Sequence, residues 1–410
     1  PALTAWEAAV IPIYQPCERM EYIIFFVSFQ GEIFMLAQIL SYSLPNEERS
    51  SAMKRMFPMI LLFALLLCVP VRADELTLDA PSALLMEKQT GTVLFAKDEH
   101  TPREPASVTK VMTLLLTMEA IDSGALSYDD TVTGSAHAAS MGGSQIWLKE
   151  SEQMTVSDML KAVCVVSAND CAVALAEQIA GSEDAFVERM NQRAKELGMN
   201  DTTFKNATGL PAQGHVTSAY DIALMSRELI LHHPDIRQYT TIWMDSLRNG
   251  ASELVNTNKL IRFFDGATGL KTGSTDSALY CLSGTAERDG MELIAVIMAA
   301  PDPKGRFADA TALLNYGYAK CSLYREEEEL PLVTVPVRGG VEETVEGEYG
   351  APFTYLSTSG QDLAGIEKKW YAKKELEAPV EQDQQIGKLV YYLDGQEIGT
   401  VEITAKTSID

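Results

Sequence analysis

The strongest constraint on the fold is the segment VMTLLLTMEAI, residues 111–121, which is apolar on nearly every side when it is wound into a helix. A helix of this kind is stable only where other elements cover it all round, so it belongs in the middle of a domain. Two strands are predicted before it in ALLMEKQTGTVLFAK, joined by a turn at residues 89–91. The segment therefore predicts a core in which a buried helix lies beside a sheet.

The rest of this region predicts helices in its middle and strands at its end. A capping-box-like start at Thr155 opens one helix, whose pattern is interrupted at residues 167–169 and resumes in CAVALAEQIAG. Further helices are predicted in EDAFVERMNQRAKEL, SAYDIALMSRELIL and GRFADATALLNYGYAK. ALYCLSGTAERDGMELIAVIMAA predicts two strands around Asp289-Gly290. This order predicts an α+β domain over residues 74–324, an antiparallel sheet with helices packed on it.

The composition changes from Arg325 onward. EEEELP marks a boundary, and LPLVTVPV and GKLVYYLDGQEIGTVEI alternate between apolar and polar residues, with glycine-containing turns. Such short alternating runs predict a small all-β domain over residues 325–410. It has no histidine and no cysteine. We therefore interpret it as a spacer or an interaction module.

The sequence MKRMFPMILLFALLLCVPVRADE, which begins at Met53, has the form of an export signal. Two basic residues precede an apolar stretch, and VRA at residues 71–73 is a small-residue cleavage pattern. The apolar stretch is too short and wrongly flanked for a stop-transfer helix. Residues 53–73 are therefore expected to be a signal peptide, with the mature chain beginning near Asp74.

Residues 1–52 are expected to be an upstream read-through that is not part of the mature protein. The chain starts with proline, and NEERSSA just before Met53 could encode a purine-rich ribosome-binding site. The alternative is a membrane segment from Tyr22 to Leu40, although Glu32 interrupts it.

Charge and metal-ligand patterns exclude several functions. The net charge of -24 argues against nucleic-acid binding, which needs a basic surface, and disfavours adhesion to anionic lipid by charge alone. The five histidines form no H-E-x-x-H pattern, and no C-x-x-C pair is present, so neither a metal nor another cofactor is predicted. The mature cysteines are expected to be small buried residues. They are Cys164, Cys171, Cys281 and Cys321.

Three short motifs carry chemically useful groups. Ser107 and Lys110, in REPASVTKVMT, lie one helical turn apart, so the hydroxyl and the amine can touch. The simpler alternative is a helix cap beside a solvated lysine, because S-x-x-K also occurs at Ser51–Lys54. However, Ser167-Ala168-Asn169 and Lys271-Thr272-Gly273 follow in order, the second at the start of the predicted closing hairpin, and each pattern occurs once. The set favours a serine nucleophile activated by its own base.

The order and separation of these motifs match the penicillin-recognising serine acyltransferases. The chain from about residue 76 to 323 resembles a low-molecular-weight penicillin-binding protein, a D-alanyl-D-alanine carboxypeptidase of the S11 peptidase type. The resemblance is carried by TGTVLFAKDEHTPREPASVTKVMT, GGSQIWLKESEQMTV, VSANDCAVALAE and DGATGLKTGSTDSALY. The tail resembles the β-rich second domain of that family in PVEQDQQIGKLVYYLDGQEIG. The resemblance implies a β-lactamase/transpeptidase-like catalytic domain.

The resemblance also implies roles for individual residues. Ser107 would be the nucleophile and Lys110 its base, provided that burial and nearby positive charge lower the lysine pKa far below about 10.4. Ser167 would relay a proton toward the leaving D-alanine. The backbone N–H groups of Ser107 and Ser274 would form the oxyanion hole, and Thr272 with Lys271 would bind the terminal carboxylate. The substrate-binding residues implied in this way are Asn169, Lys271, Thr272, Gly273, Ser274 and Arg306. His215 and Asp221 are expected to be structural.

Three functions stay open at this point. The first is a carboxypeptidase that removes the terminal D-alanine from peptidoglycan stem pentapeptides and is inhibited by β-lactam antibiotics. The second is a β-lactamase of the same fold, although MNDTTFKNATGL lacks the glutamate of the class A E-x-x-L-N segment. The third is a non-catalytic wall-binding module, against which the intact motifs argue.

The expected location is outside the cytoplasm, at the cell wall or the outer face of the cytoplasmic membrane. Family members usually end in an amphipathic membrane-anchoring helix, and no such anchor is seen before Asp410. Membrane association therefore stays open.

Overall fold

The computed structural model describes residues 76–410 and the backbone of a short hairpin, β1 (Val27–Phe29) with β2 (Glu32–Phe34). Apart from this hairpin, the predictions for residues 1–52 and 53–73 lie outside the described residues. Within the described part of the chain, no helix combines the length and the apolar character needed to span a membrane.

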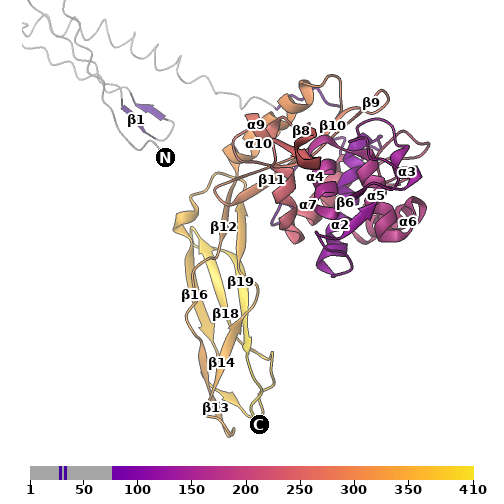
Figure 1. Cartoon of the computed structure of the whole chain (residues 1–410). Helices are drawn as coiled ribbons and strands as arrows, with labels where there is room; N and C mark the ends of the chain where they lie inside the picture. Colours follow the sequence, from indigo (N-terminus) through magenta and orange to yellow (C-terminus); the bar gives the residue numbers. More distant parts are fainter. Residues whose placement is uncertain (1–26, 30–31, 35–75) are drawn as a thin grey trace, which may run out of the picture. The chain divides into compact units, whose positions relative to one another are not determined.

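The first domain (Figure 1) is built on a five-stranded sheet. The strand order is β4-β3-β11-β10-β9, and every neighbouring pair is antiparallel. The bounds of its strands are β3 (Ser82–Glu87), β4 (Val93–Lys97), β9 (Ala267–Thr275), β10 (Leu279–Arg288) and β11 (Met291–Ala300). The central strand β11 is buried along almost its whole length. The sequence of β11 is an almost continuous apolar run because helices cover both faces of the sheet, so side chains on both sides of the strand are buried.

Helices cover the two faces of this sheet unequally. On one face, α10 (Gly305–Lys320) packs against Leu293 and Ala295 of β11. On the other, Ile294 and Val296 join the larger core that contains α2 and α7. The helices on that side are α2 (Lys110–Asp122), α3 (Ala136–Ala139), α4 (Val156–Val166), α5 (Asn169–Ala180), α6 (Glu183–Glu196) and α7 (Ala219–His232).

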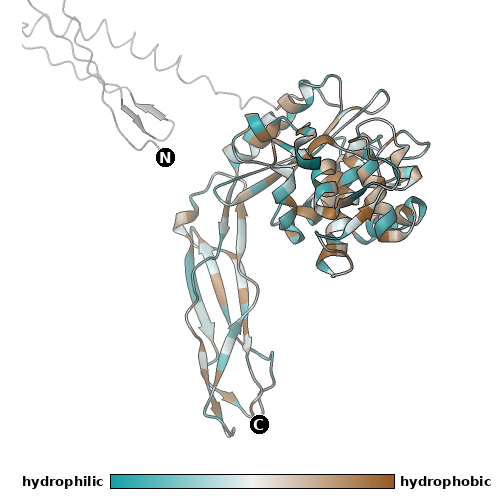
Figure 2. Ribbon diagram, in the orientation of Figure 1, coloured by the Kyte–Doolittle hydropathy of each residue, from teal (hydrophilic) through white to brown (hydrophobic). Residues whose placement is uncertain are grey.

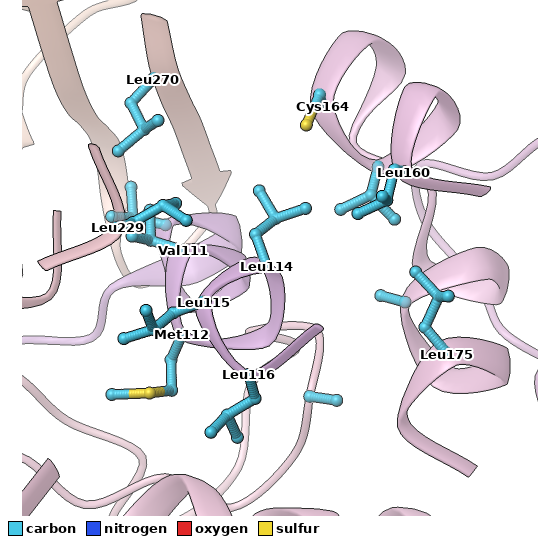
Figure 3. Close-up of a cluster of buried hydrophobic side chains, with 14 of the residues drawn as sticks. Val111, Met112, Leu114, Leu115, Leu116, Leu160, Cys164, Leu175, Leu229 and Leu270 are labelled. Atoms are coloured by element: carbon cyan, nitrogen blue, oxygen red, sulfur yellow. The ribbon is translucent and has the colours of Figure 1, made fainter. Parts of the chain in front are cut away.

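Helix α2 lies at the centre of the larger core, as its all-round apolar sequence predicts. Its side chains from Lys110 to Met118 are all buried. Figure 3 shows leucines of α2 pointing to several sides, with Leu160 of α4, Leu175 of α5 and Leu229 of α7 around them. Burial of α2 fixes the position of Lys110 at its first turn.

The boundaries of several elements follow their local signals. The Thr155 hydroxyl accepts a hydrogen bond from the backbone N–H of Asp158 and begins α4. A left-handed Ser167 ends that helix, and α5 begins at Asn169. The turn between β10 and β11 is at Asp289 and Gly290, as predicted. The predicted α+β class of the first domain is confirmed.

Several short elements were not predicted. The structure contains two-stranded ribbons and short helical turns whose few residues show no clear period. They are β5 (Thr131–Thr133) with β6 (Gln153–Thr155), β7 (Met244–Leu247) with β8 (Ser252–Val255), α8 (Arg237–Thr240), α9 (Leu260–Phe263), η1 (Ala106–Thr109), η2 (Pro234–Ile236) and η3 (Arg248–Gly250). The K-T-G motif lies inside the nine-residue strand β9, which the sequence analysis did not recognise as a strand.

The C-terminal region is all-β, as predicted, with a six-stranded sheet in the order β16-β18-β19-β14-β13-β17. Hydrophobic and hydrophilic residues alternate along its long strands (Figure 2). The hydrophobic residues that face inward form its core. Its elements are β13 (Thr334–Arg338), β14 (Thr344–Tyr349), β15 (Thr354–Ser357), η4 (Leu363–Gly365), β16 (Glu367–Ala372), β17 (Leu376–Glu377), β18 (Gln385–Leu393) and β19 (Gln396–Ala405). The predicted boundary after residue 324 falls within β12 (Ser322–Arg325), which pairs with β15.

Candidate active site

Ser107 and Lys110 are in direct contact. Ser107 lies in η1, and Lys110 is the first residue of α2. Lys110 Nζ donates hydrogen bonds to Ser107 Oγ at 2.9 Å and to the carbonyl oxygen of Thr208 at 2.7 Å. The amine therefore has a fixed position beside the hydroxyl, as the i, i+3 spacing predicts.

The buried position of Lys110 makes its amine a base. Its side chain is completely inaccessible to solvent. Burial and then the positive charge of Lys271 hold the pKa of Lys110 well below the usual 10.5, while Asp170 acts in the opposite direction. A neutral amine has a lone pair that can accept the proton of Ser107.

Lys271 is buried as well. Its Nζ donates to the carbonyl oxygen of Thr272 at 2.9 Å. Burial lowers the pKa of Lys271 to about 7, and Arg306 adds to this effect. Two buried lysines with lowered pKa values in one place are typical of a functional site.

The second motif presents two side-chain oxygens without partners. Ser167 has the left-handed backbone (φ 63°) that ends α4, and Asn169 begins α5. Within the described residues, Ser167 Oγ and Asn169 Oδ1 are buried and have no hydrogen-bond partner. Buried polar groups normally have partners, so these two atoms are suited to contact a substrate.

A loop at residues 142–148 holds Asn169 in place. The Asn169 amide donates from Nδ2 to the Gly142 carbonyl at 2.7 Å, and its backbone N–H donates to the Ser144 carbonyl at 2.7 Å. The next residue, Asp170, accepts hydrogen bonds from the backbone N–H groups of Ile146 and Leu148. Hydrogen bonds at two adjacent residues, Asn169 and Asp170, thus hold the loop against the second motif.

Strand β9 brings the third motif against the first. A Cβ added at Gly273 would lie 2.8 Å from the Pro105 carbonyl oxygen and 2.9 Å from the backbone nitrogens of Ser107 and Val108. Glycine is therefore required there, because any side chain would push β9 away from η1. Ser274, the next residue, is consequently close to the Ser107 backbone.

Thr272 belongs to a hydrogen-bonded bridge between the third and second motifs. Its hydroxyl shares a hydrogen bond of 2.7 Å with the Thr257 hydroxyl. The Thr257 backbone N–H donates to the Val165 carbonyl at the end of α4 at 3.1 Å. The structure therefore brings all three predicted motifs together around Ser107.

Arg306 contacts the strand that carries the third motif. Its Nη1 donates to the carbonyl oxygens of Gly273 at 2.9 Å and Cys281 at 3.3 Å. The guanidinium also lies near the rings of Tyr280 and Phe307. In the structure it supports β9, and its predicted action on the substrate carboxylate stays a prediction.

Sequence reasoning missed the loop at residues 206–210, which positions Lys110. Asn206 Oδ1 accepts hydrogen bonds from the backbone N–H groups of Thr208 and Gly209, and this turn aims the Thr208 carbonyl at Lys110. The Gly209 backbone (φ 82°) lies so close to η1 that a Cβ would be 1.8 Å from the Ala106 carbonyl. The Asn-x-x-Gly spacing is a turn signal, but nothing local relates it to a lysine 98 residues away.

His215 and Asp221 support neighbouring backbone. His215 Nδ1 accepts from the backbone N–H of Lys205, so its Nε2–H donates to the Thr109 hydroxyl at 2.8 Å. Burial lowers the pKa of His215 to about 4, so the ring is neutral at pH 7. Asp221 accepts from Thr202 and from the backbone N–H of Asp201.

The four cysteines within residues 76–410 are free and buried, as predicted. In residues 76–410, no group of three or more histidine, cysteine or acidic side chains has the arrangement of a metal site. The site thus consists of a serine, two lysines and unpaired polar atoms, a set suited to acyl transfer through a serine ester.

Comparisons with known proteins agree with this chemistry. Residues 70–302 match the family described as D-alanyl-D-alanine carboxypeptidase, peptidase S11. Residues 318–410 match the family described as penicillin-binding protein 5, C-terminal domain. The chain is 42% identical over 341 residues to D-alanyl-D-alanine carboxypeptidase DacF of Bacillus subtilis, covering 82% of this chain and 87% of that protein.

Solved structures show the same fold. Penicillin-binding protein 5 from Haemophilus influenzae has a TM-score of 0.68 at 29% identity, covering 81% of this chain and 98% of that chain. Penicillin-binding protein D2 from Listeria monocytogenes, in an ampicillin-bound form, has a TM-score of 0.55 at 33% identity, covering 60% of this chain and 99% of that chain.

Proposed function

Because the chain belongs to the peptidase S11 family of D-alanyl-D-alanine carboxypeptidases, a family of serine-type hydrolases, we propose that Ser107 is its nucleophile and Lys110 its general base. The substrate is a peptidoglycan stem pentapeptide, and the product that leaves is its terminal D-alanine. The observation that carries this assignment is the 2.9 Å hydrogen bond between a fully buried Lys110 amine and the Ser107 hydroxyl.

Acylation begins with proton transfer from Ser107 to the neutral Lys110 amine. Ser107 Oγ then attacks the carbonyl carbon of the penultimate D-alanine, and the backbone N–H groups of Ser107 and Ser274 stabilise the oxyanion. One such donor is typically worth about 10²–10³ in rate. The protonated Lys110 returns this proton through the Ser167 hydroxyl to the leaving amine, the C–N bond breaks, and an ester joins the shortened peptide to Ser107. Water then hydrolyses this ester.

The substrate is held by the second and third motifs. The side-chain oxygen of Asn169 accepts a hydrogen bond from a substrate amide, which is consistent with its lack of a partner in the described residues. Thr272 and Lys271 bind the terminal carboxylate, with Gly273 allowing β9 to lie close to η1. Arg306 adds positive charge behind β9 and favours the same carboxylate.

A β-lactam acylates the same serine. The neighbour from Listeria monocytogenes is described with ampicillin bound, which supports this assignment. The penicilloyl ester is expected to be long-lived, because the loop at residues 199–210 offers no glutamate to aim a water at it. This separates the carboxypeptidase from a β-lactamase of the same fold.

The mature protein begins near Asp74 and acts outside the cytoplasm, at the cell wall or the outer face of the cytoplasmic membrane. The basic, apolar and small-residue segments at 53–73 support export. Edman sequencing of the exported protein should give a first residue at or next to Asp74. Peptides from residues 1–52 in the exported form would contradict both the export signal and the read-through interpretation.

Mass spectrometry of a muramyl pentapeptide incubated with the protein tests the function. The expected result is loss of one alanine from the peptide, together with a stable penicilloyl adduct that maps to Ser107. Ser167→Ala is the companion variant, which should slow D-alanine release without removing the labelling site. Clearance of the penicillin adduct within seconds, without release of D-alanine, would instead establish a β-lactamase.

A further inference from the structure

Trp147 is the most exposed aromatic residue of the described first domain. Its side chain is 74% exposed, whereas its neighbours Ile146 and Leu148 are buried. Its backbone has the left-handed conformation (φ 61°), which is rare for a bulky residue. Such a conformation persists only where the surrounding structure holds it.

The backbone on both sides of Trp147 is clamped. Asp170 accepts hydrogen bonds from the N–H groups of Ile146 at 3.1 Å and Leu148 at 2.9 Å. The Ile146 carbonyl accepts from Arg248 Nη1 at 2.8 Å. With Ile146 and Leu148 buried, the indole is held on the opposite, solvent-facing side of the loop. The backbone that carries the indole is therefore fixed.

The clamp places Trp147 beside the residue that holds the substrate amide. Asp170, which anchors both neighbours of Trp147, directly follows Asn169 in the chain. Asn169 is bonded to the same loop at Gly142 and Ser144. The described residues leave Asn169 Oδ1 without a partner, so this end of the loop faces the substrate.

The direction of the substrate follows from the third motif. The terminal carboxylate is bound at Thr272, and the reacting carbonyl lies at Ser274, two residues further along β9. The part of the peptide that stays on the enzyme therefore runs away from Thr272 and past Asn169. Because Asp170 ties both neighbours of Trp147 to the residue after Asn169, Trp147 is the exposed aromatic residue that adjoins this acyl side. The residue next to the reacting D-alanine is the first side chain that can reach it, because an extended peptide advances about 3.3 Å per residue.

We propose that Trp147 binds the side chain of the residue that precedes D-alanyl-D-alanine, and that it selects a long side chain with an aliphatic stem. This inference rests on the proposed function, because it uses the substrate direction assigned there. The flat indole face and the methylene groups of such a side chain exclude water from each other, whereas a methyl side chain is too short to cover the ring.

Kinetics on a pair of peptides test this proposal. N-acetyl-norleucyl-D-Ala-D-Ala and N-acetyl-alanyl-D-Ala-D-Ala differ only in the aliphatic stem. Trp147→Ala is expected to lower kcat/KM for the norleucyl peptide about four- to fifteenfold, which corresponds to one or two buried methylene groups. It should leave kcat/KM for the alanyl peptide within about twofold, and Trp147→Phe should restore most of the loss.

The matched control is Phe263→Ala. Phe263 lies at the end of α9 in the same domain and is 73% exposed, almost as much as Trp147. It is also close in sequence to Thr257, which contacts the carboxylate-binding Thr272. Its replacement should change neither peptide. If Trp147→Ala lowers kcat/KM equally for both peptides, the tryptophan only shapes the loop. If it changes kcat/KM for neither peptide, the tryptophan does not contact the substrate. Either result overturns the proposal. Absence of D-alanine release by the unaltered protein from both peptides would instead refute the proposed function.

Discussion

Replacement of Gly273 by alanine tests the close approach of β9 and η1. The added Cβ would lie 2.8 Å from the Pro105 carbonyl oxygen and 2.9 Å from the nitrogens of Ser107 and Val108. Real Cβ atoms essentially never come within 3.0 Å of another heavy atom in this way. All three obstacles are backbone atoms, so no side-chain rotation can relieve them. Either η1 or β9 must move.

The magnitude follows from this displacement. Overpacking a well-packed site typically costs about 1–3 kcal/mol. In a domain of this size, that corresponds to a decrease in Tm of roughly 2–12 °C. The effect on catalysis is larger, because both proposed oxyanion donors, Ser107 and Ser274, lie at the contact that must open. A misplacement of reacting groups by about 1 Å can cost about 10²-fold in rate.

The assay is the acylation rate with a fluorescent penicillin, measured beside Tm. Gly273→Ala is expected to lower the acylation rate by about two orders of magnitude while most of the protein stays folded at 25 °C. Gly365→Ala is the matched control, because a Cβ there meets only a Leu393 carbon at 3.9 Å, an ordinary van der Waals contact, and should leave the rate unchanged. A Gly273→Ala variant that acylates at the unaltered rate would refute the argument that this contact positions the oxyanion donors.

Three further predictions concern the base, the nucleophile and the tail. Ser107→Ala should abolish penicillin labelling without unfolding the protein, as shown by intact mass and Tm; a label retained elsewhere would contradict the assignment. Because the pKa of Lys110 is lowered and only the neutral amine is a base, acylation should fall as the pH decreases through that pKa, and Lys110→Arg should lose about 10²–10⁴ in rate. A chain that ends at Cys321, before β12, should still release D-alanine from a small peptide, because every reacting group precedes it; a folded but inactive truncation would show that the tail shapes the site.

Local signals in the sequence predicted most of the long elements. The Thr155 cap, the Asp289-Gly290 turn and the all-round apolar α2 each act over a few neighbouring residues. Their physical cause is contained in the segment itself, so their structure agrees with the prediction. Strand β9 was missed because its residues, ATGLKTGST, are small or polar yet mostly buried, and show no alternation that a strand pattern could detect.

The three motifs were predicted, but the groups that hold their side chains in position were not. Thr208 binds the Lys110 amine through its carbonyl oxygen, a group that every residue carries and that no side-chain pattern reveals. Asp170 is adjacent to Asn169, yet its function depends on backbone N–H groups more than twenty residues earlier. Long-range backbone contacts of this kind arise only when the chain has folded.

The two buried lysines predict that substrate binding increases the neutral, proton-accepting fraction of Lys110. Burial lowers the pKa of Lys271 to about 7, so near neutral pH it is only partly charged before substrate binds. A substrate carboxylate at Thr272 favours the charged form and raises the pKa of Lys271. The charge gained on Lys271 then lowers the pKa of Lys110 further, because this lysine already acts on Lys110 in that direction. More of Lys110 is therefore neutral in the complex than in the free enzyme.

This coupling has a measurable sign. The profile of kcat against pH reports the enzyme–substrate complex, and that of kcat/KM reports the free enzyme. With a peptide that has a free terminal carboxylate, the acid limb of kcat should lie at lower pH than the acid limb of kcat/KM. With the same peptide amidated at its C-terminus, the two limbs should coincide, because no negative charge reaches Lys271. Coincident limbs for the free acid would mean that the charge of Lys271 does not respond to the carboxylate, and this result would refute the coupling between substrate binding and the pKa of Lys110.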